Sequence, residues 1–324
     1  MKKPFLSLLI IVITFSLFAK DPIRITTWNI EHLGSYGRGL GGIGSGSLGF
    51  RTDAQLQDIA SFIKDTLKSD IVAIQEVALN NYVYGIKIND KLEKLVEYLG
   101  EDWEYVIGST GGTEEIGYLS RNMQNAFLWN TTRVKLIKSF DLELENILVG
   151  TTQAFSRLPL AGYFEALHAT KTDRTDFLLV NVHLKSGQDN NENHLAAMVI
   201  IEQSLSPFLK ANSIKESDRV ILGDFNDNPY DERYFDFLYQ YMADKKYTDL
   251  TTEDIGATRM DNNLTSIIDH VLVNSSMQLE MKDVQAEKYM PSLDHNELAQ
   301  WRKTYSDHFP ITFEVKVLKD KDVD

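Results

Sequence analysis

Short, nearly continuous apolar runs recur along the chain and alternate with longer stretches in which apolar residues are spaced three or four apart. Continuous runs are typical of buried strands, and the wider spacing is typical of amphipathic helices. Strands are predicted at residues 23–30, 70–77, 126–129, 134–139, 176–184, 219–222, 266–273 and 309–317. Helices are predicted at residues 52–68, 90–99 and 192–210. Mixed strands with intervening helices predict layered sheets covered by helices, an α/β fold.

The start of the chain has a different pattern. Lys2 and Lys3 precede an apolar run at residues 5–18, and the small residue Ala19 follows it. This order is typical of a secretory signal peptide, and the run is short for a membrane span of about 20 residues. An uncleaved N-terminal anchor is the alternative. We expect residues 1–19 to be removed and the protein to be exported, secreted or periplasmic, without stable membrane association.

The remaining chain has no internal repeat, no proline-rich linker and no change of composition that would divide it. Residues 20–324 are therefore expected to form a single domain. The full sequence has 33 Lys and Arg against 47 Asp and Glu, a net charge of −14. This balance argues against a protein held on DNA or acidic lipid by bulk positive charge. The absence of cysteine excludes disulfide scaffolds, thiolate metal sites and cysteine nucleophiles.

Polar residues with catalytic or metal-binding capacity stand where predicted strands end or begin. They lie in six segments, at residues 27–31, 74–77, 181–184, 223–227, 268–270 and 306–308. Burying such groups inside a strand costs several kcal/mol unless they are paired or bound to metal, whereas at a strand end they can share a cleft. Together they supply hard oxygen ligands and two histidines capable of acid–base chemistry. Such a set suits magnesium, calcium or manganese rather than zinc.

In this order, the six segments resemble the endonuclease/exonuclease/phosphatase superfamily, which includes deoxyribonuclease I and exonuclease III. The most diagnostic pieces are Gly-Asp-Phe-Asn at residues 223–226 and Ser-Asp-His at residues 306–308, and the resemblance extends over residues 23–317. It implies a four-layered α/β sandwich of the deoxyribonuclease I type, in which helices flank two packed mixed β-sheets. It also implies metal-dependent hydrolysis of phosphate esters at one end of the sandwich.

The resemblance implies a role for each matching residue. The implied metal ligands are Asn29, Glu76 and Asp307. The implied catalytic residues are His183, Asp224, Asn226, Asp269 and His308. Arg157 and Asn181 are assigned to substrate binding. Within these sets, Asp224 and Asn226 position the attacking water and a phosphate oxygen, Asp269 orients His308, and His183 lies opposite His308.

The chemistry of phosphate esters gives these roles a physical reason. A phosphodiester repels hydroxide, so Mg²⁺, with Ca²⁺ or Mn²⁺ as alternatives, would neutralise the charge that develops on its oxygens. A carboxylate beside an imidazole fixes the tautomer and raises the basicity of the ring. Which histidine is the acid and which the base stays open, as does the choice of Asp224 or a histidine to activate water. The number of metal ions is also open.

Two positions depart from the family pattern or vary within it. Deoxyribonuclease-like members carry a glutamate near residues 123–124 that supports the first histidine. Here Gln124 or Asn125 would have to act as a neutral partner of His183. Glu31 is either a second metal ligand or a solvated acid, because family members vary at this position.

The preferred substrate is DNA, with RNA as a further possibility, since residues 183–187 and 268–273 look most like extracellular bacterial nucleases. The first alternative is a phospholipid phosphodiesterase similar to secreted sphingomyelinases, which would need an exposed aromatic hairpin. Tyr82 and Tyr84 lie in a predicted loop that could supply one. A phosphatase and a non-enzymatic binding module on the same scaffold are the remaining alternatives. The sequence does not determine the oligomeric state.

Overall fold

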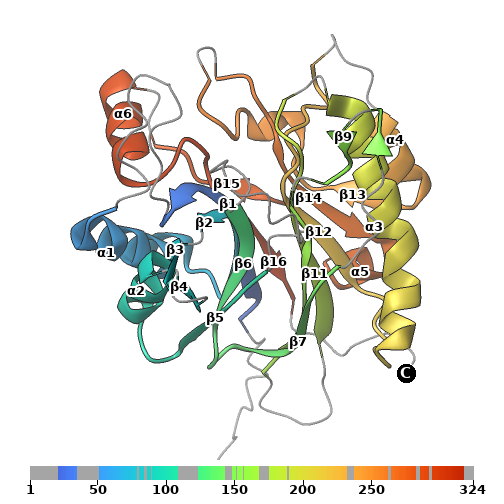
Figure 1. Ribbon diagram of the computed structural model, residues 1–324, viewed down its shortest axis with the longest axis horizontal. Helices are drawn as coiled ribbons and strands as arrows, with labels where there is room; N and C mark the ends of the chain where they lie inside the picture. Colours follow the sequence, from blue (N-terminus) through green and yellow to red (C-terminus); the bar gives the residue numbers. More distant parts are fainter. Residues whose placement is uncertain are drawn as a thin grey trace, which may run out of the picture.

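Two six-stranded mixed sheets pack face to face and have helices on their outer sides (Figure 1). The computed structural model describes residues 21–34, 51–78, 80–83, 86–88, 90–108, 123–142, 148–150, 152–155, 157–167, 175–187, 190–231, 237–261, 264–281, 285–291 and 294–316. The predicted signal peptide lies outside these ranges. No described helix is long and apolar enough to cross a membrane.

The sheets, here called sheet I and sheet II, each combine parallel and antiparallel pairs. Sheet I has the strand order β15 (Glu287–Lys288), β16 (Ile311–Val315), β1 (Ile23–Leu33), β2 (Ile71–Ala78), β6 (Met123–Asn130) and β5 (Trp103–Ile107). Sheet II has the order β13 (Tyr247–Asp249), β14 (Asp269–Asn274), β12 (Arg219–Asp224), β11 (Asp176–His183), β10 (Leu160–Ala166) and β7 (Val134–Asp141). Two small hairpins, β3 (Asn80–Val83) with β4 (Ile86–Ile88) and β8 (Leu148–Val149) with β9 (Thr152–Gln153), complete the strands of the described residues.

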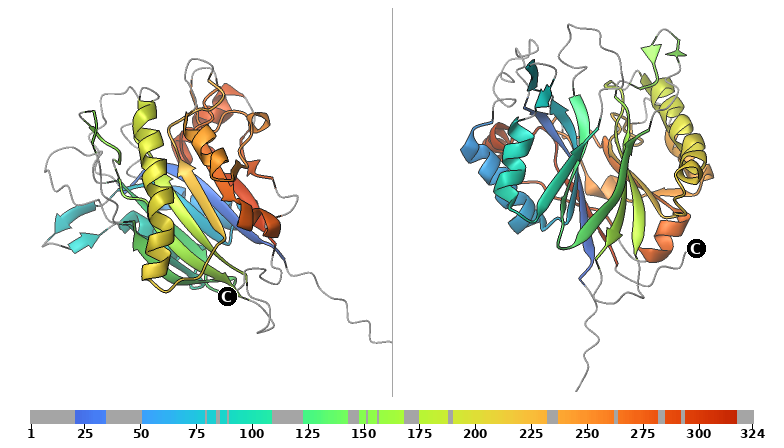
Figure 2. Two further views of the ribbon diagram at one scale, coloured as in Figure 1. Left: turned by 90° about the vertical axis from the view of Figure 1, so that its right-hand side faces the viewer. Right: turned by 60° about the horizontal axis from the view of Figure 1, so that its bottom comes forward.

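Helices form the two outer layers (Figure 2). Sheet I is covered by α1 (Asp53–Ser61), which continues into η2 (Phe62–Leu67), and by α2 (Asp90–Leu99) and α6 (His295–Thr304). Sheet II is covered by α3 (Asn191–Ala211) and α4 (Phe237–Asp244). The short helices η5 (Glu253–Ile255) and α5 (Ser275–Glu280) lie in connections. The predicted four-layered α/β sandwich is confirmed.

The central strands explain the continuous apolar runs of the sequence. Every residue of β11 is buried. Successive side chains of a strand point to opposite faces, so Phe177 and Leu179 enter the core between the sheets while Leu178 and Val180 pack under α3. Between the sheets, the rings of Phe127 and Phe164 meet edge to face with centroids 5.4 Å apart. Strands buried on both faces lose the alternation of polar and apolar residues.

Local sequence also sets the helix ends. The predicted cap Thr52 forms a capping box, because its Oγ1 accepts a hydrogen bond from the Gln55 backbone N–H and Gln55 Oε1 accepts one from the Thr52 N–H. The predicted helix at residues 52–68 becomes an α-helix followed by a π-helical segment that ends at left-handed Lys68 (φ 52°). The predicted helix at residues 90–99 matches α2.

Several elements had no clear periodic signal in the sequence. Strand β5 is an edge strand in which Glu104 is exposed and the three residues after it are only partly buried, so its pattern is diffuse. Strand β10 contains Gly162, which a sequence pattern favours as a turn. In the structure, Gly162 leaves room for the ring of Phe164, which lies 2.5 Å from where a Cβ would stand. Tertiary packing, rather than local preference, selects both strands.

Gly223 is expected to tolerate no side chain. Its φ is 143°, and a Cβ would stand 2.0 Å from the carbonyl oxygen of Val182 on the neighbouring strand β11. Gly223→Ala should therefore lower the free energy of unfolding by about 3 kcal/mol or more, beyond ordinary backbone strain of about 1–3 kcal/mol. Urea unfolding measures the change. Gly100→Ala is the control, since Gly100 also has positive φ (113°) but open space around it; equal losses in both variants would contradict the steric explanation.

Candidate functional site

The six polar segments come together at one end of the sandwich, the upper end in Figure 1. Strands β1 and β2 run parallel in sheet I, and β11 and β12 run parallel in sheet II, so each pair ends on one side. Strands β16 and β14 are antiparallel to β1 and β12, so they begin on that same side. The strand directions therefore place residues from both halves of the chain in one site.

Asn29 links the two sheets at this end. Its Nδ2 donates to Glu76 Oε1 of β2 at 3.1 Å and to Asp224 Oδ2 of β12 at 2.9 Å. Its Oδ1 accepts a hydrogen bond from the backbone N–H of Glu31 at 3.0 Å. Asn29 is buried, and its amide therefore fixes the two predicted carboxylates relative to one another.

The backbone is irregular where these side chains project. Four non-glycine residues of the site have positive φ: Glu31 (48°), His32 (60°), Glu76 (61°) and Asn226 (51°). The register of β1 on β2 shifts after Asn29, and the register of β2 on β6 shifts after Ile74. Such bulges turn side chains out of the regular alternation. Strained backbone collects at functional sites, where surrounding contacts hold it in place.

Glu31 and Asp307 form a second acidic group, compensated by arginines. Glu31 Oε2 accepts a hydrogen bond from the Asp307 N–H at 2.9 Å, and Glu31 Oε1 accepts one from Arg302 at 3.1 Å. Arg259 Nε donates to Asp307 Oδ2 at 3.3 Å. Burial, followed by the charge of Asp307, raises the pKa of Glu31. Burial also opposes the charge of Asp307, but His308, Arg259 and Arg302 outweigh it and lower the pKa of that carboxyl.

Glu31 is thus a buried, hydrogen-bonded acid rather than a solvated one. Sequence reasoning also missed Arg51, which is fully buried and donates to the carbonyl oxygens of Ile30, Glu31 and Tyr305. Burial lowers the pKa of Arg51 to about 10, so the guanidinium stays charged at neutral pH. It ties the irregular end of β1 to the segment that leads to His308.

His308 and Asp269 form the predicted pair. His308 Nδ1 lies 2.8 Å from Asp269 Oδ2, and both residues are buried. The two backbone N–H groups of Ile268 and Asp269 donate to Thr258 Oγ1, which fixes the start of β14. Burial disfavours a charged imidazole, yet Asp269, Asp307 and Asp224 together raise the pKa of His308 to about 10. The ring is therefore an imidazolium at neutral pH.

Asp224 lies between the two predicted histidines. Its Oδ2 is 3.8 Å from His308 Nε2 and 3.5 Å from His183 Nε2. Its Oδ1 accepts a hydrogen bond from the Asn226 N–H at 2.9 Å. Burial is the main reason that the pKa of Asp224 rises to about 6. The carboxyl is therefore ionised at neutral pH, and it is able to take up a proton at a pH close to neutral.

His183 has the opposite electrostatics to His308. Burial, reinforced by the positive charges of Arg157 and His308, holds the pKa of His183 well below its ordinary value. The neutral ring has Nε2 3.9 Å from Glu76 Oε1. Its Nδ1 has no hydrogen-bond partner among the described residues, and the same holds for Gln124 Oε1 and Asn125 Oδ1. Neither predicted neutral partner is bonded to His183 in this structure.

The two predicted substrate-binding residues have different surroundings. Arg157 is largely buried, its Nε and Nη1 have no hydrogen-bond partner among the described residues, and it interacts electrostatically with Glu76 and Asp224. A guanidinium with free N–H groups fits an anion in the site. Asn181, by contrast, is fully buried between the sheets. Its Nδ2 donates to the carbonyls of Ile74 and Ala126, and its Oδ1 accepts from Gln75, so the structure does not bring it into the group.

The donor chemistry of the site fits a hard divalent cation. Carboxylate oxygens, which such a cation prefers, come from Glu31, Glu76 and Asp307. The charges of Asp307 and Glu76 lie close enough to Glu31 to raise its pKa. Asn29 presents its Nδ2 to Glu76 in this structure. A second arrangement of donor atoms, from Asp224, Asp269 and His308, lies within 4.8 Å. Among the described residues, this is the acidic and histidine group whose donor atoms come that close together, although the Asp269–His308 hydrogen bond already occupies one of its ring nitrogens. The first group contains the predicted ligands Glu76 and Asp307.

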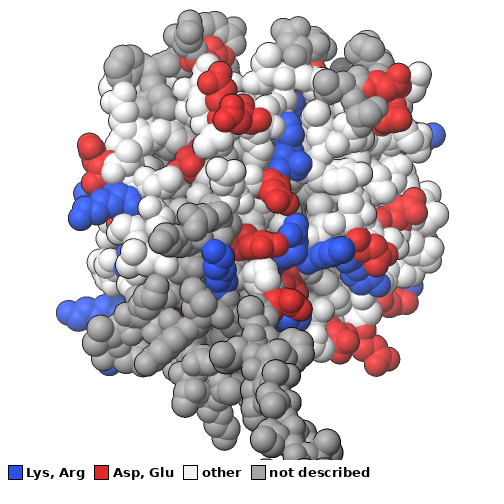
Figure 3. Space-filling view, turned by 180° about the vertical axis from the view of Figure 1, so that it is seen from behind, with Lys and Arg blue, Asp and Glu red and all other residues white. Residues whose placement is uncertain are grey.

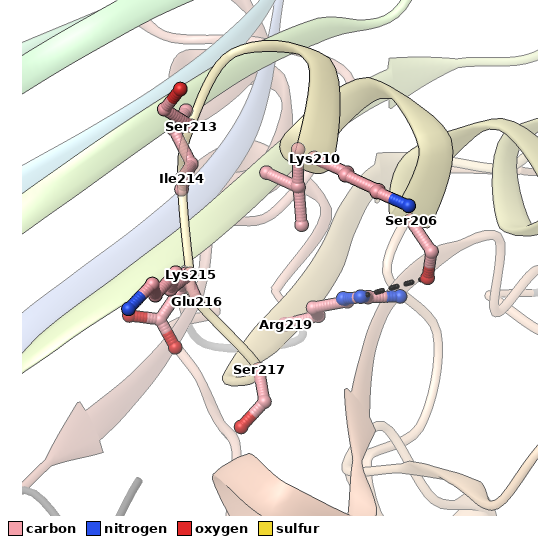
Figure 4. Close-up of a pocket in the computed structure, with 9 residues that line it drawn as sticks. Ser206, Lys210, Ser213, Ile214, Lys215, Glu216, Ser217 and Arg219 are labelled. Carbon is pink, nitrogen blue, oxygen red and sulfur yellow. Dashed lines mark hydrogen bonds between the residues drawn. The ribbon is translucent and has the colours of Figure 1, made fainter. Parts of the chain in front are cut away.

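A surface cavity of about 590 Å³ lies at the other end of β12 (Figure 4). Its walls include Lys210, Lys215 and Arg219, and Arg219 donates to Ser206 Oγ at 3.0 Å. Asp224 is at the opposite end of the strand that begins with Arg219. The cavity is therefore separate from the candidate site.

Comparison with known proteins identifies the family to which the chain is related. The model of the endonuclease/exonuclease/phosphatase family matches residues 26–308. A curated protein from Thioalkalivibrio sp. (strain K90mix), named deoxyribonuclease, is 22% identical over 320 residues, covering 97% of this chain and 77% of the relative.

Solved structures show the same fold at low sequence identity. An endonuclease/exonuclease/phosphatase from Bacteroides vulgatus is 15% identical with a TM-score of 0.57, covering 92% of this chain and 100% of that one. The human nocturnin catalytic domain is 14% identical with a TM-score of 0.53, covering 90% and 93%. A mannosyl-6-phosphatase from Bacteroides thetaiotaomicron is 12% identical with a TM-score of 0.53, covering 90% and 99%. The differing names show that the fold alone does not select a substrate.

The contribution of His308 to stability should depend on pH. Because the pKa of its ring is raised to about 10 in the folded protein, its stabilisation is complete below the ordinary histidine pKa of about 6.5 and is lost as pH rises through 10. His308→Gln should therefore cost about 2 kcal/mol or more at pH 6 and less at pH 10. Urea unfolding of both proteins with chelator present measures the difference. A cost that is independent of pH would contradict the assignment of a charged ring.

Proposed function

The chain belongs to the endonuclease/exonuclease/phosphatase family, and from this membership and the site described above we propose that it is an exported, divalent-metal-dependent phosphodiesterase that cuts DNA. Members of the family hydrolyse phosphate esters. The observation that carries the proposal is the position of Asp224 between two histidines, with Oδ2 3.8 Å from Nε2 of His308, which Asp269 keeps charged, and 3.5 Å from Nε2 of the neutral His183.

These states suggest how a phosphodiester is hydrolysed. Asp224, with a pKa of about 6, accepts the proton of the attacking water, and Asn226 holds a phosphate oxygen. The water oxygen bonds to phosphorus as the bond to the leaving oxygen breaks. His308, kept charged by Asp269, donates its Nε2 proton to that oxygen. His183 and Arg157 hold the remaining phosphate oxygens through N–H groups.

The metal ligands in this proposal are Glu76 and Asp307, with Glu31 beside them and Asn29 in the role that the family pattern implies. A bound Mg²⁺, or Ca²⁺ or Mn²⁺, would supply charge neutralisation at the phosphate. In this proposal Asn181 does not contact the substrate. It joins the two sheets, because its amide on β11 donates hydrogen bonds to backbone carbonyls of β2 and β6.

Two observations favour DNA over other phosphate esters. The curated relative is named deoxyribonuclease. Arg157 offers N–H groups suited to a backbone phosphate. Basic and acidic side chains are interspersed over the face in Figure 3, and the chain carries −14 overall. Capture of DNA therefore relies on the site and on divalent ions rather than on long-range attraction.

A phospholipid phosphodiesterase is the second candidate, and one feature favours it. The β3–β4 hairpin projects from the sandwich (Figure 2). Tyr82 belongs to β3, whereas Tyr84 lies outside the described residues. A projecting hairpin that presents aromatic side chains would enter a membrane interface. Hydrolysis of sphingomyelin vesicles without cleavage of DNA would select this candidate.

Purified residues 20–324 are expected to nick supercoiled plasmid when Mg²⁺ is present and to lose this activity with excess chelator. His308→Ala should reduce the rate by about 100-fold or more, because the leaving oxygen loses its proton donor. Gel analysis of plasmid forms measures the rate, and circular dichroism checks that the variant is folded. Folded wild-type protein that leaves plasmid intact would overturn the proposal.

Arg157→Ala is expected to weaken DNA binding and to lower the salt dependence of log affinity by about one unit, the contribution of one phosphate contact. Binding is measured by fluorescence anisotropy on a duplex in the His308→Ala background, so that cleavage does not interfere. Arg133→Ala is the matched control, since Arg133 is paired with Asp70 at 3.1 Å at the other end of the sandwich. A similar change in both variants would remove Arg157 from the phosphate site.

A further inference from the structure

A second pair of histidines lies behind the site, on the outer side of sheet II. His270 follows Asp269 on β14, and His194 lies in the first turn of α3. Both are fully buried and neither has a role in the proposed reaction. Both contact Asp227, which comes directly after the Asp224–Asn226 turn.

The hydrogen-bond partners of His270 show which of its ring nitrogens carry protons. Nδ1 lies 2.7 Å from Asp249 Oδ2, and Nε2 lies 3.0 Å from the Ile267 carbonyl oxygen and 3.2 Å from that of Asp227. A carbonyl oxygen only accepts hydrogen bonds, so Nε2 carries a proton. An ionised carboxylate only accepts hydrogen bonds, and Asp249 already accepts one from the Thr251 N–H, so Nδ1 carries a proton as well. The ring is therefore an imidazolium.

The surroundings of His270 match a fixed cation. The rings of Phe225 and Tyr239 meet the imidazole edge to face, with centroids 5.5 Å and 5.0 Å away. Burial opposes the charge, but Asp249 outweighs it and raises the pKa of His270. A charge in such a place is stable only when paired and hydrogen-bonded, and the contacts with Asp249 and the two carbonyls meet this condition.

His194 lies on the other side of Asp227. Its Nε2 lies 2.6 Å from the Lys185 carbonyl oxygen, whereas its Nδ1 is 3.5 Å from Asp227 Oδ2 and makes no hydrogen bond with the described residues. Asp227 is thus held at its carbonyl by His270 of β14, and α3 contributes only a long contact. The same turn carries Asn226, whose backbone has positive φ and whose Nδ2 donates to the Leu184 carbonyl at 3.2 Å.

We propose that His270, as a permanently charged imidazolium, acts as a clamp on the Asp227 carbonyl that positions Asp224 and Asn226 for reaction. It is a positioning residue, since it does not reach the site itself. The expected effect on kcat rests on the proposed function. The protonation of His270 and the rigidity of the turn do not depend on that function.

The first test is independent of activity. In ¹⁵N NMR spectra of the full mature protein, both ring nitrogens of His270 should carry protons from pH 6 to 8, and Asp249→Asn should remove one of them within that range. A wild-type ring with one bare nitrogen at pH 7 would overturn the charged clamp. This result would stand whether or not the protein cleaves DNA.

The second test separates positioning from stability. His270→Gln should increase amide hydrogen exchange at Asn226 about tenfold or more and lower kcat on DNA by about 10–100-fold with KM changed less than about twofold, as expected for a misplaced catalytic group. Ile201→Ala, in the same core beneath α3, is the control for general destabilisation. Matching exchange and kcat changes in the control would overturn the clamp.

Unchanged exchange in folded His270→Gln would overturn it as well. If wild-type protein shows no cleavage of DNA, the proposed function fails, and the NMR and exchange measurements still decide the clamp. His270→Gln that does not fold is replaced by Asp249→Asn, which keeps the shape of the partner and removes its charge. The clamp predicts increased exchange at Asn226 in that variant too.

Discussion

Carboxylates crowded into a nearly dry end of the sandwich set the conditions that the rest of the site has to meet. Glu31, Asp224, Asp269 and Asp307 are all buried there. Ionised carboxylates in such surroundings are stable only beside positive charge or hydrogen-bond donors. The structure supplies these from several layers: Arg51 before α1, Arg302 from α6, Arg259 from the loop before β14, and the ring of His308.

This need for compensation explains features that otherwise look unrelated. Helix α6 packs through Trp301 and Leu298 on the outer core of sheet I, and its next residue, Arg302, reaches Glu31. Arg51 holds the turn at the end of β1 against the segment before His308. The aromatic packing of one layer therefore contributes to the electrostatics of another. A divalent cation would enter a site whose acidic groups are already arranged by these arginines.

Sequence reasoning located what depends on local pattern and missed what depends on distant partners. The central strands and the helix α2 follow from uninterrupted apolar periodicity, and the family motifs identified Asp224, Asp269 and His308, which the fold brings together. Arg51 gave no signal, because a lone arginine outside the predicted strands and helices is usually solvated. Glu31 was ambiguous because its burial as a charged group depends on Arg302, which lies 271 positions away in the sequence. Asn181 shared the motif of His183, but strand alternation alone did not reveal that its amide spans to the other sheet.

The pairing of β1 with β16 has a consequence for the timing of assembly. Strand β1 lies between β2 and β16 in sheet I, and Asn29 and His308 come from opposite ends of the chain. Until residues 306–315 have left the ribosome, the growing polypeptide lacks Ser306, Asp307 and His308 in its site. One edge of β1 also has no partner strand at that stage. The ribosome therefore produces no shortened intermediate with a complete site. If the proposed activity on DNA holds, this architecture delays activity until synthesis of the chain is nearly finished.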